Sequence, residues 1–482
     1  MLKKIITLST LVITTSAFAI PVDWHGVFGV DSTRVDQYRK ATSNPAISTA
    51  DGSQATDIHG SNAENASFQT YLLKLQPTFV INDSVTLNGE LTTNYGRGGF
   101  LGDNSTKQGQ SSYTFGNALY LHNTNNGDSL LLNRFYAELF ADTATFIVGR
   151  YSKHWGLGAI YNSGDKLWDR HYSGHDGFDA RLKLGSFYFT PYWSKLSNGS
   201  TQVNTDDVSD YGISVLYDNK DKDIALGVHF SKRKAKQYAT TYASSTANST
   251  TAIPLGSTNV KLWDVYLSKS FGAFKIGVEV PLASGDMGNV YSTTQRSAFK
   301  ANAVLLESSL ELNKKWTLGL DGGQVSGDNG GEANFEAMYL HPNYQVAHLL
   351  FRYNMSNMRN GNSIFDSYIT NARYGKLYAQ YMTDTWKLKT AFIYATAMES
   401  AKAGSVAFNH EKNKKFTATQ NQSDDLGYEL DFDIEYNWNT NVSLGFQLGY
   451  LFTGDYFAFT NTANQQKVEN SYLTNFHVAV EF

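Results

Sequence analysis

The sequence of 482 residues contains no cysteine and only 7 prolines. Without cysteine, disulfide-stapled scaffolds and Cys-ligated zinc or iron–sulfur sites are excluded. After the first nineteen residues no run of about eighteen apolar residues occurs, which excludes a protein that crosses a membrane with helices. The 40 basic and 44 acidic side chains nearly balance, so the charge does not indicate nucleic-acid binding.

Aromatic side chains, in contrast, are abundant: the chain has 30 Tyr, 29 Phe and 8 Trp. This is too much apolar surface for a disordered chain, so an ordered structure must hold these residues. The first nineteen residues predict an export signal, because Lys3 and Lys4 precede an apolar stretch and an Ala17-Phe18-Ala19 cleavage motif. The mature domain is then expected over 20–482.

Apolar residues alternate with polar ones along most of the chain, which predicts β-strands. The clearest case is 428–438, where Tyr428, Leu430 and Phe432 alternate with acidic residues. Similar alternation occurs at 71–79, 85–95, 178–184, 187–193, 263–267, 274–280, 304–312, 316–320, 386–394, 442–452 and 472–482. No helical period of useful length competes with it.

Connections between these segments alternate in length, which is typical of outer-membrane barrels. Short turns are predicted at 82–84, 142–143, 185–186, 218–222, 272–273, 313–315, 383–385 and 439–441, with long polar loops between them. We therefore predict an all-β fold: a single antiparallel transmembrane β-barrel of about 18 strands (16–20), with short periplasmic turns and long extracellular loops. The weakest segment, 331–342, is expected to be a strand, a loop or an inward fold, and the loop 97–129 is expected to narrow the pore.

The charged residues that lie out of phase with the apolar face are expected to line a water-filled lumen, because charges on the lipid face are costly. They are Arg134, Glu138, Asp179, Arg181, Lys183, Lys275, Glu279, Glu307, Glu311, Lys387, Lys389, Glu429, Asp431, Asp433 and Glu435. The segments with Lys387 and Glu435 follow one another, so a basic and an acidic ladder should be neighbours. They would either orient polar solutes or simply pair across strands.

The chain ends on Phe482, with Val480, Val478 and Phe476 in step behind it. This ending resembles the C-terminal signal of bacterial outer-membrane barrels. The resemblance implies that Phe476 and Phe482 are read by the barrel-assembly machinery.

A Gly- and aromatic-rich segment carries a second resemblance. Gly149-Arg150, then Trp155-Gly156, and the Asp176 to Arg181 ending resemble the loop region of alginate-export-type outer-membrane porins, although Tyr151 stands where the family usually has Gln. The resemblance implies a wide barrel that passes saccharides or small polar solutes. Physically, Arg150, Trp155, Trp168 and Arg170 combine flat apolar faces with charged donors, as a saccharide site needs; an interfacial aromatic girdle is the alternative.

Histidines at 154, 171 and 175, with Asp169 and Asp176, raise the alternative of a metal site or a barrel hydrolase. No HExxH and no G-x-S-x-G motif supports it, so we expect no enzyme, no metal and no cofactor.

These observations together predict a porin in the outer membrane of a Gram-negative bacterium, which lets small hydrophilic solutes and ions diffuse passively. The alternatives are a saccharide-specific or exopolysaccharide export channel and a plugged structural or adhesive protein. Expected partners are outer-membrane lipid and lipopolysaccharide, the assembly machinery, and polar solutes or saccharides. No nucleic acid is expected, and the oligomeric state stays open.

Overall fold

The computed structural model describes residues 21–38, 65–101, 128–197, 207–236, 241–243, 252–292, 294–353, 364–411, 413–461 and 468–482. The predicted signal peptide and most of the loop 97–129 lie outside these residues. None of the helices among the described residues is long and apolar enough to cross a membrane.

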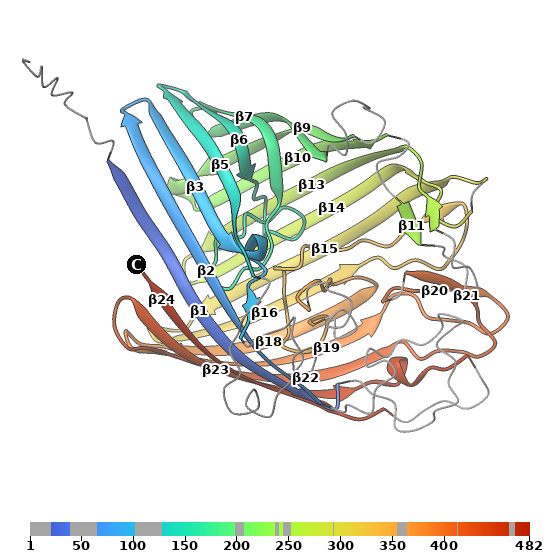
Figure 1. The fold of residues 1–482 in the computed structure, drawn as a ribbon. Coiled ribbons are helices and arrows are strands. Elements are labelled where there is room, and N and C mark those ends of the chain that lie inside the picture. The colour runs from blue at the N-terminus through green and yellow to red at the C-terminus, as the bar shows by residue number, and fades with distance from the viewer. Residues whose placement is uncertain are drawn as a thin grey trace, which may run out of the picture.

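Eighteen of the described strands form one closed antiparallel barrel, which confirms the predicted fold (Figure 1). Closure comes from the first and last strands, since Val30 lies opposite Val478 in register. With closure, every strand pairs on both sides and no sheet edge remains. The barrel strands are β1 (Val22–Asp36), β2 (Asn65–Asn82), β3 (Val85–Thr93), β5 (Leu130–Ala141), β6 (Ala144–Ser152), β7 (Gly174–Leu184), β8 (Phe187–Ser197), β9 (Val208–Asn219), β10 (Ile224–Ala235), β13 (Thr258–Phe271), β14 (Phe274–Gly288), β15 (Ser297–Glu311), β16 (Trp316–Val325), β18 (Ala372–Met382), β19 (Trp386–Ala397), β22 (Asp425–Asn437), β23 (Val442–Thr453) and β24 (Ser471–Glu481).

Short elements lie outside the barrel wall. β4 (Gly99–Phe100) pairs with β2, and β17 (Asn334–Phe335) pairs parallel with β15. The two small hairpins β11–β12 (Thr241–Ala243, Ala252–Pro254) and β20–β21 (Val406–Asn409, Lys414–Thr417) belong to the long loops. The remaining short elements are the 3-10 turns η2 (Asn94–Gly96), η5 (Lys220–Lys222) and η7 (Asp455–Ala458).

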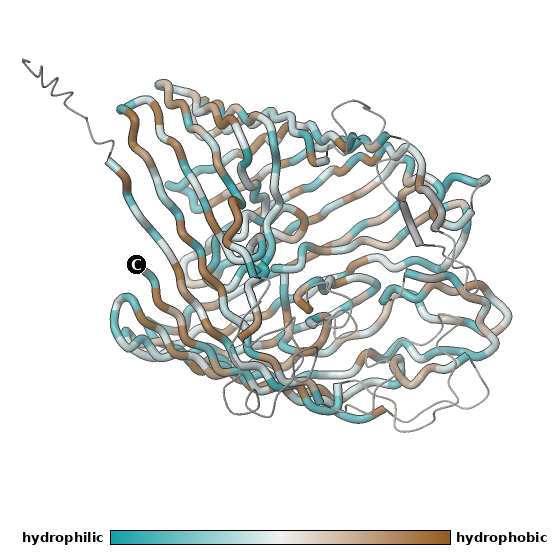
Figure 2. Tube along the Cα trace, in the orientation of Figure 1, coloured by the Kyte–Doolittle hydropathy of each residue, from teal (hydrophilic) through white to brown (hydrophobic). Residues whose placement is uncertain are grey.

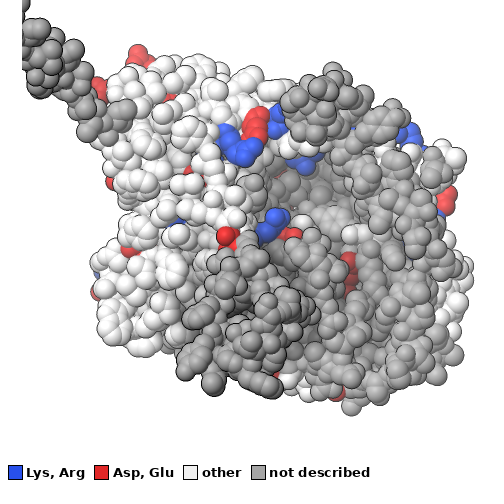
Figure 3. Space-filling view, viewed as in Figure 1, with Lys and Arg blue, Asp and Glu red and all other residues white. Residues whose placement is uncertain are grey.

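The alternation of apolar and polar residues becomes the two faces of the wall. Large apolar side chains such as Trp263, Leu430 and Phe392 are exposed on the outside, while their polar neighbours turn inward. Brown apolar positions recur along the strands of the wall in Figure 2, and the wall over β1, β2 and β3 shows few charges in Figure 3. An apolar exterior on a closed sheet is what contact with lipid acyl chains requires.

All the predicted short turns join neighbouring strands at one end of the barrel. Both chain termini of the described part lie at this end, where the backbones of Gly26 and Phe482 exchange hydrogen bonds of 2.7 and 3.0 Å. The long connections lie at the other end. Two of them, however, fold back into the barrel and shape its interior.

Candidate functional site: a lumen narrowed by two inward loops

The first inward loop, residues 153–173, connects β6 with β7 and enters the lumen. It begins at a buried ion pair, in which Nζ of Lys153 lies 2.8 Å from the carboxylate of Asp179 on β7. The same ammonium sits 3.6 Å from the ring centroid of Tyr192 on β8. The sequence predicted a loop here but placed it outside, because alternation in the strands says nothing about where a loop of this length will pack.

One half of the first inward loop packs on β10 and β14. Trp155 lies against His229, with ring centroids 5.5 Å apart, and the backbone N–H of Leu157 donates to Glu279. Gly227 makes room for this approach, because a Cβ at this position would lie 2.6 Å from the Trp155 ring. The indole of Trp155 therefore packs directly against β10.

The other half of this loop contacts the opposite flank of the barrel. Asp165 pairs with Arg134 on β5 at 2.7 Å, and Arg170 pairs with Asp31 on β1 at 3.0 Å. Lys74 on β2 donates to two carbonyl oxygens of the loop, those of residues 164 and 166, at 3.2 and 3.0 Å. The loop is thus held by charged contacts to β5, the neighbour of β6, and to the more distant strands β1 and β2, while its other half packs on β10 and β14.

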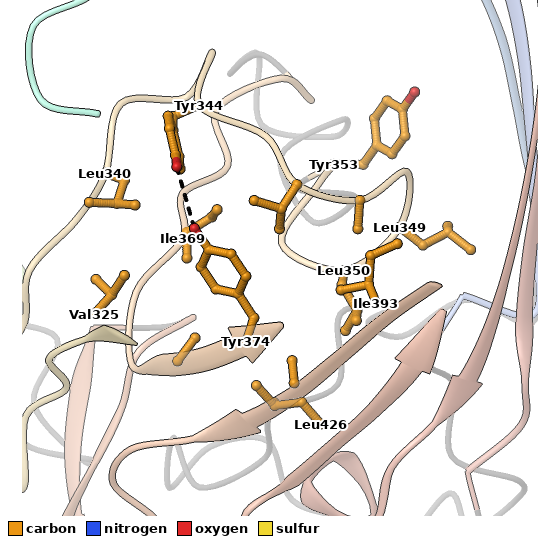
Figure 4. Packing of buried hydrophobic residues seen from close by; sticks show 14 of the residues in the cluster. Val325, Leu340, Tyr344, Leu349, Leu350, Tyr353, Ile369, Tyr374, Ile393 and Leu426 are labelled. Carbon is orange, nitrogen blue, oxygen red and sulfur yellow. Dashed lines mark hydrogen bonds between the residues drawn. The ribbon is translucent and has the colours of Figure 1, made fainter. Parts of the chain in front are cut away.

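The second inward loop comprises the described residues 326–353 and 364–371 between β16 and β18. Its buried apolar side chains, including Leu340, Leu350 and Ile369, pack together with Tyr374 and Ile393 of the wall (Figure 4). Burying a side chain such as Leu stabilises a fold by about 1.5–3 kcal/mol. The hydrophobic interior of this protein is therefore formed between the inward loops and the inner face of the wall.

A carboxylate of β22 fixes the second inward loop. The Glu429 side chain accepts hydrogen bonds from the backbone N–H groups of His348, Leu349 and Leu350 at 2.9, 2.7 and 2.7 Å. Asp431 accepts from the N–H of His348 at 3.2 Å. Three amides around one carboxylate form an anion-binding arrangement that satisfies a buried charge. Asp433 also lies 3.0 Å from Nε2 of His348, so three of the four residues of the acidic ladder contact this loop.

The two inward loops meet inside the barrel. The N–H of His341 donates to the carbonyl of Ala159 at 2.6 Å, and the side-chain amide of Asn343 donates to the carbonyl of His171 at 2.7 Å. Nε2 of His171 lies 2.7 Å from Oδ1 of Asp366. The loops therefore narrow the lumen as one connected unit.

Protonation follows from this packing. Burial alone would raise the pKa of Asp366, but the hydrogen bond to His171 and the charges of Arg97 and His171 lower it below its usual value. Burial, with smaller contributions from nearby histidines, lowers the pKa of His341 to about 4. His341 is then neutral at physiological pH, and its Nδ1 can accept from the N–H of Asn343 at 3.2 Å.

A recess of about 870 Å³ lies between the first inward loop and the wall of β19, β22 and β23, and extends to the short-turn end. Its lining includes Trp168, Lys387, Lys389, Asp433 and Glu435. The two ladders are direct neighbours here: Lys387 lies opposite Glu435 in register, and their charged atoms are 3.4 Å apart. Cross-strand pairing therefore occupies Lys387, whereas the Lys389 ammonium lies over the Tyr378 ring at 4.4 Å.

The residues predicted for the lumen all alternate with exposed apolar side chains of their own strands, which places them on the inner face. Arg134, Asp179, Glu279, Glu429 and Asp431 hold the inward loops. Glu138 accepts from Asn88 at 3.2 Å. Lys387, Lys389, Asp433 and Glu435 line the recess. Glu307 lies opposite Asp321, and Arg181, Lys183, Lys275 and Glu311 lie towards the short-turn end of their strands.

The structure separates the four residues of the candidate saccharide loop. Trp168 lines the recess, Trp155 is buried on β10, and Arg170 is buried against Asp31. Arg150 points away from the lumen, because it lies opposite Phe135 in register, whose ring is exposed on the outer face, and it pairs with Asp176 at 2.7 Å. The alternation could have shown this orientation of Arg150.

The remaining candidates are also placed. Phe476 and Phe482 are exposed on the outer face of β24 and at its end. The three histidines do not form one site. His171 contacts Asp366 of the second inward loop, whereas Nδ1 of His175 lies 2.8 Å from Oγ of Ser194. Within the described ranges no group of His, Cys, Asp or Glu could hold a metal ion.

Sequence reasoning missed several residues of the lumen. Glu90 accepts from the buried Arg134, and Asp31 holds Arg170. Both lie out of phase with apolar neighbours in β3 and β1, so the alternation that identified Glu138 could have identified them as well. Lys153 sits outside any strand and carried no such signal.

No protein-family model and no curated protein match this sequence. Solved structures do. OccK2 (OpdF) of Pseudomonas aeruginosa matches with a TM-score of 0.51 at 10% identity, covering 95% of this chain and 98% of that one. OpdL of the same organism matches with a TM-score of 0.50 at 9% identity, covering 95% and 99%. At this identity the likeness shows a shared barrel fold.

Proposed function

We propose that this chain is an outer-membrane porin through which small hydrophilic solutes and ions diffuse passively. The observation that carries the proposal is a closed wall, apolar outside and charged inside, whose lumen is narrowed by two inward loops beside a recess of about 870 Å³. Such a lumen filters by size and charge and needs no catalytic step. The inward loops set the size limit, and Lys389 and Asp433 lie where a solute would pass.

Conductance of the purified protein in a planar lipid bilayer tests this proposal. Because the chain has no cysteine, one introduced thiol can report on the path of the current. We expect Lys389→Cys channels to lose conductance when a bulky charged thiol reagent is added. Lys314→Cys, in an exposed short turn, is the matched control and should be unaffected. Absence of any conductance would instead support the plugged structural or adhesive protein.

A saccharide-specific or exopolysaccharide export channel is the second candidate, and Trp168 favours it. This ring faces the recess together with Gln380, Lys389 and Gln447, so a flat apolar face lies beside hydrogen-bonding groups. Sugar rings are bound by this combination. Neutral oligosaccharides should then interrupt the ion current of the native channel, and Trp168→Ala should remove the interruption while ion current persists. Equal interruption in both proteins contradicts a saccharide site at Trp168. The resemblance to alginate-export-type porins stays a prediction.

The outer-membrane location also predicts contacts outside the lumen. Phe476 on the outer face of β24 and Phe482 at its end are both exposed, so the assembly machinery could read them. Replacing both with Ala should reduce the amount of assembled barrel in cells, while the purified variant should still refold in detergent. Lipid and lipopolysaccharide are the partners that the apolar exterior and its rim would meet.

A further inference from the structure

A row of lysines crosses the outside of the barrel near its long-loop end. Lys232 on β10 lies opposite Lys261 on β13, Lys261 lies opposite Ser284 on β14, and Ser284 lies opposite Lys300 on β15. Neighbouring strands are about 4.8 Å apart, so the three ammonium groups share a strip about 15 Å wide. We call these three lysines and Ser284 the lysine row.

The lysine row lies on the outer face of the wall. Trp263 lies two residues from Lys261 along β13, and Leu282 lies two residues from Ser284 along β14. Both are exposed apolar side chains. Because side chains alternate along a strand, residues two apart share a face. The rings of Trp263 and Phe230 are 4.6 Å apart and lie just below the row, towards the middle of the barrel.

Like charges placed directly opposite each other on neighbouring strands destabilise a sheet. Among the described residues, no carboxylate forms an ion pair with Lys232, Lys261 or Lys300. The cations slightly nearer the long loops are different: Lys195 pairs with Asp207 at 3.2 Å, and Arg296 pairs with Asp286 at 2.7 Å. The lysine row therefore concentrates positive charge that the described protein does not neutralise.

A recess of about 550 Å³ adjoins the row at the rim of the barrel. Its lining includes Trp193, Lys195, Lys234, Asn259 and Arg296. Asp207 and Asp286 also line this recess and pair with Lys195 and Arg296, but its four cations still outnumber these two carboxylates. The surface thus has three levels: an apolar aromatic band, the lysine row above it, and a polar cationic recess above the row.

We propose that the lysine row and the adjoining recess bind the phosphorylated head group of a glycolipid of the outer leaflet, with lipopolysaccharide as the partner. The phosphates would accept hydrogen bonds from the lysines, the sugars would enter the recess, and the acyl chains would lie on the band of Trp263 and Phe230. Charge complementarity favours this partner over a second copy of the chain, whose own row would repel it. The proposal uses the membrane location but not the conductance of the lumen.

Native mass spectrometry of the detergent-solubilised protein with purified lipid A tests the proposal. We expect the native protein to retain lipid A that carries both phosphates, and the triple variant K232Q/K261Q/K300Q to bind it about a hundredfold more weakly. Lipid A without phosphates should bind both proteins equally weakly. Because these substitutions are on the exposed surface, circular dichroism should show an unchanged barrel in the variant.

The matched control is K220Q/K314Q/K315Q, which removes the same charge from the exposed short turns at the opposite end. It should bind lipid A as the native protein does. Equal binding by the lysine-row variant, or an equal loss in the control, would overturn the proposal. Binding of inorganic phosphate as tight as that of lipid A would also overturn it. So would an oligomer of the native protein that only the lysine-row variant loses. A conducting channel that fails this test would leave the proposed porin function intact.

Discussion

Nε2 of His171 lies 2.7 Å from Oδ1 of Asp366, and this contact joins two loops that are 195 residues apart in the sequence. Arg97 reaches the same carboxylate oxygen at 3.3 Å. Asp366 therefore connects the first inward loop, the second inward loop and the segment that follows η2.

Asp366→Asn should loosen the junction of the inward loops. The amide keeps the shape of the side chain but loses its charge attraction to His171 and Arg97, a loss of about 1 kcal/mol for a partly exposed pair. This corresponds to about fivefold more frequent opening events, measured as steps in single-channel recordings. Asp142→Asn, in an exposed short turn, is the control. Unchanged recordings in Asp366→Asn contradict a role for this junction in gating.

Acid should open the same junction. Since the folded protein lowers the pKa of Asp366, its carboxylate stabilises the junction above the unfolded value of about 3.9, and this contribution is lost as pH falls through the lower folded pKa. Opening events should therefore increase below about pH 4. The Asp366→Asn channel should lack this acid response; an identical response in both channels assigns it to another group.

Glu429→Gln should release the second inward loop. Glu429 accepts three backbone hydrogen bonds. In the variant only one side-chain oxygen can accept, and the NH2 group faces backbone N–H groups. We expect this to destabilise the docked loop by about 1.5–3 kcal/mol. Limited proteolysis should then cut within 340–353 faster than in the native protein. Glu435→Gln is the comparison, because its pair with Lys387 is partly exposed and 3.4 Å long. Equal cleavage rates in all three proteins would refute the anchoring role.

Lys389→Glu should shift ion selectivity towards cations. Each unit of charge acting on an ion about 7 Å away in water contributes about 0.6 kcal/mol, or about threefold in relative occupancy. The reversal potential across a salt gradient measures this shift. Arg150→Gln also removes a positive charge but lies on the outer face, so the reversal potential should not change. A shift in Arg150→Gln and none in Lys389→Glu would place the ion path elsewhere.

Arg134→Met should destabilise the barrel strongly. Arg134 and Glu90 are both buried, and removing one partner leaves an uncompensated charge at a cost of about 3–5 kcal/mol. Guanidinium-induced unfolding followed by tryptophan fluorescence measures the free energy. The double variant R134M/E90L should recover most of the loss, because both charges are gone. A double variant as unstable as the single one would mean that packing rather than charge dominates.

The amino-acid sequence determined the barrel itself. Tyr428, Leu430 and Phe432 alternate with Glu429, Asp431 and Asp433, and because the pleat of a strand fixes which face each side chain takes, this local pattern predicted both the wall and the charged interior. Short turns such as 142–143 and 272–273 predicted, also from local sequence, that the strands they join are antiparallel neighbours. The neighbouring ladders of Lys387 and Glu435 followed from the order of the segments.

Only the tertiary structure decided which residues contact each other inside the barrel. It brought Trp155 onto β10, Arg170 to Asp31, and the amides of 348–350 to Glu429, and these partners lie far apart in the sequence. It also joined Lys232, Lys261 and Lys300 into one row through strand register. A periodic pattern is a property of a few neighbouring residues, whereas the position of a loop depends on contacts with residues that are far away in the sequence.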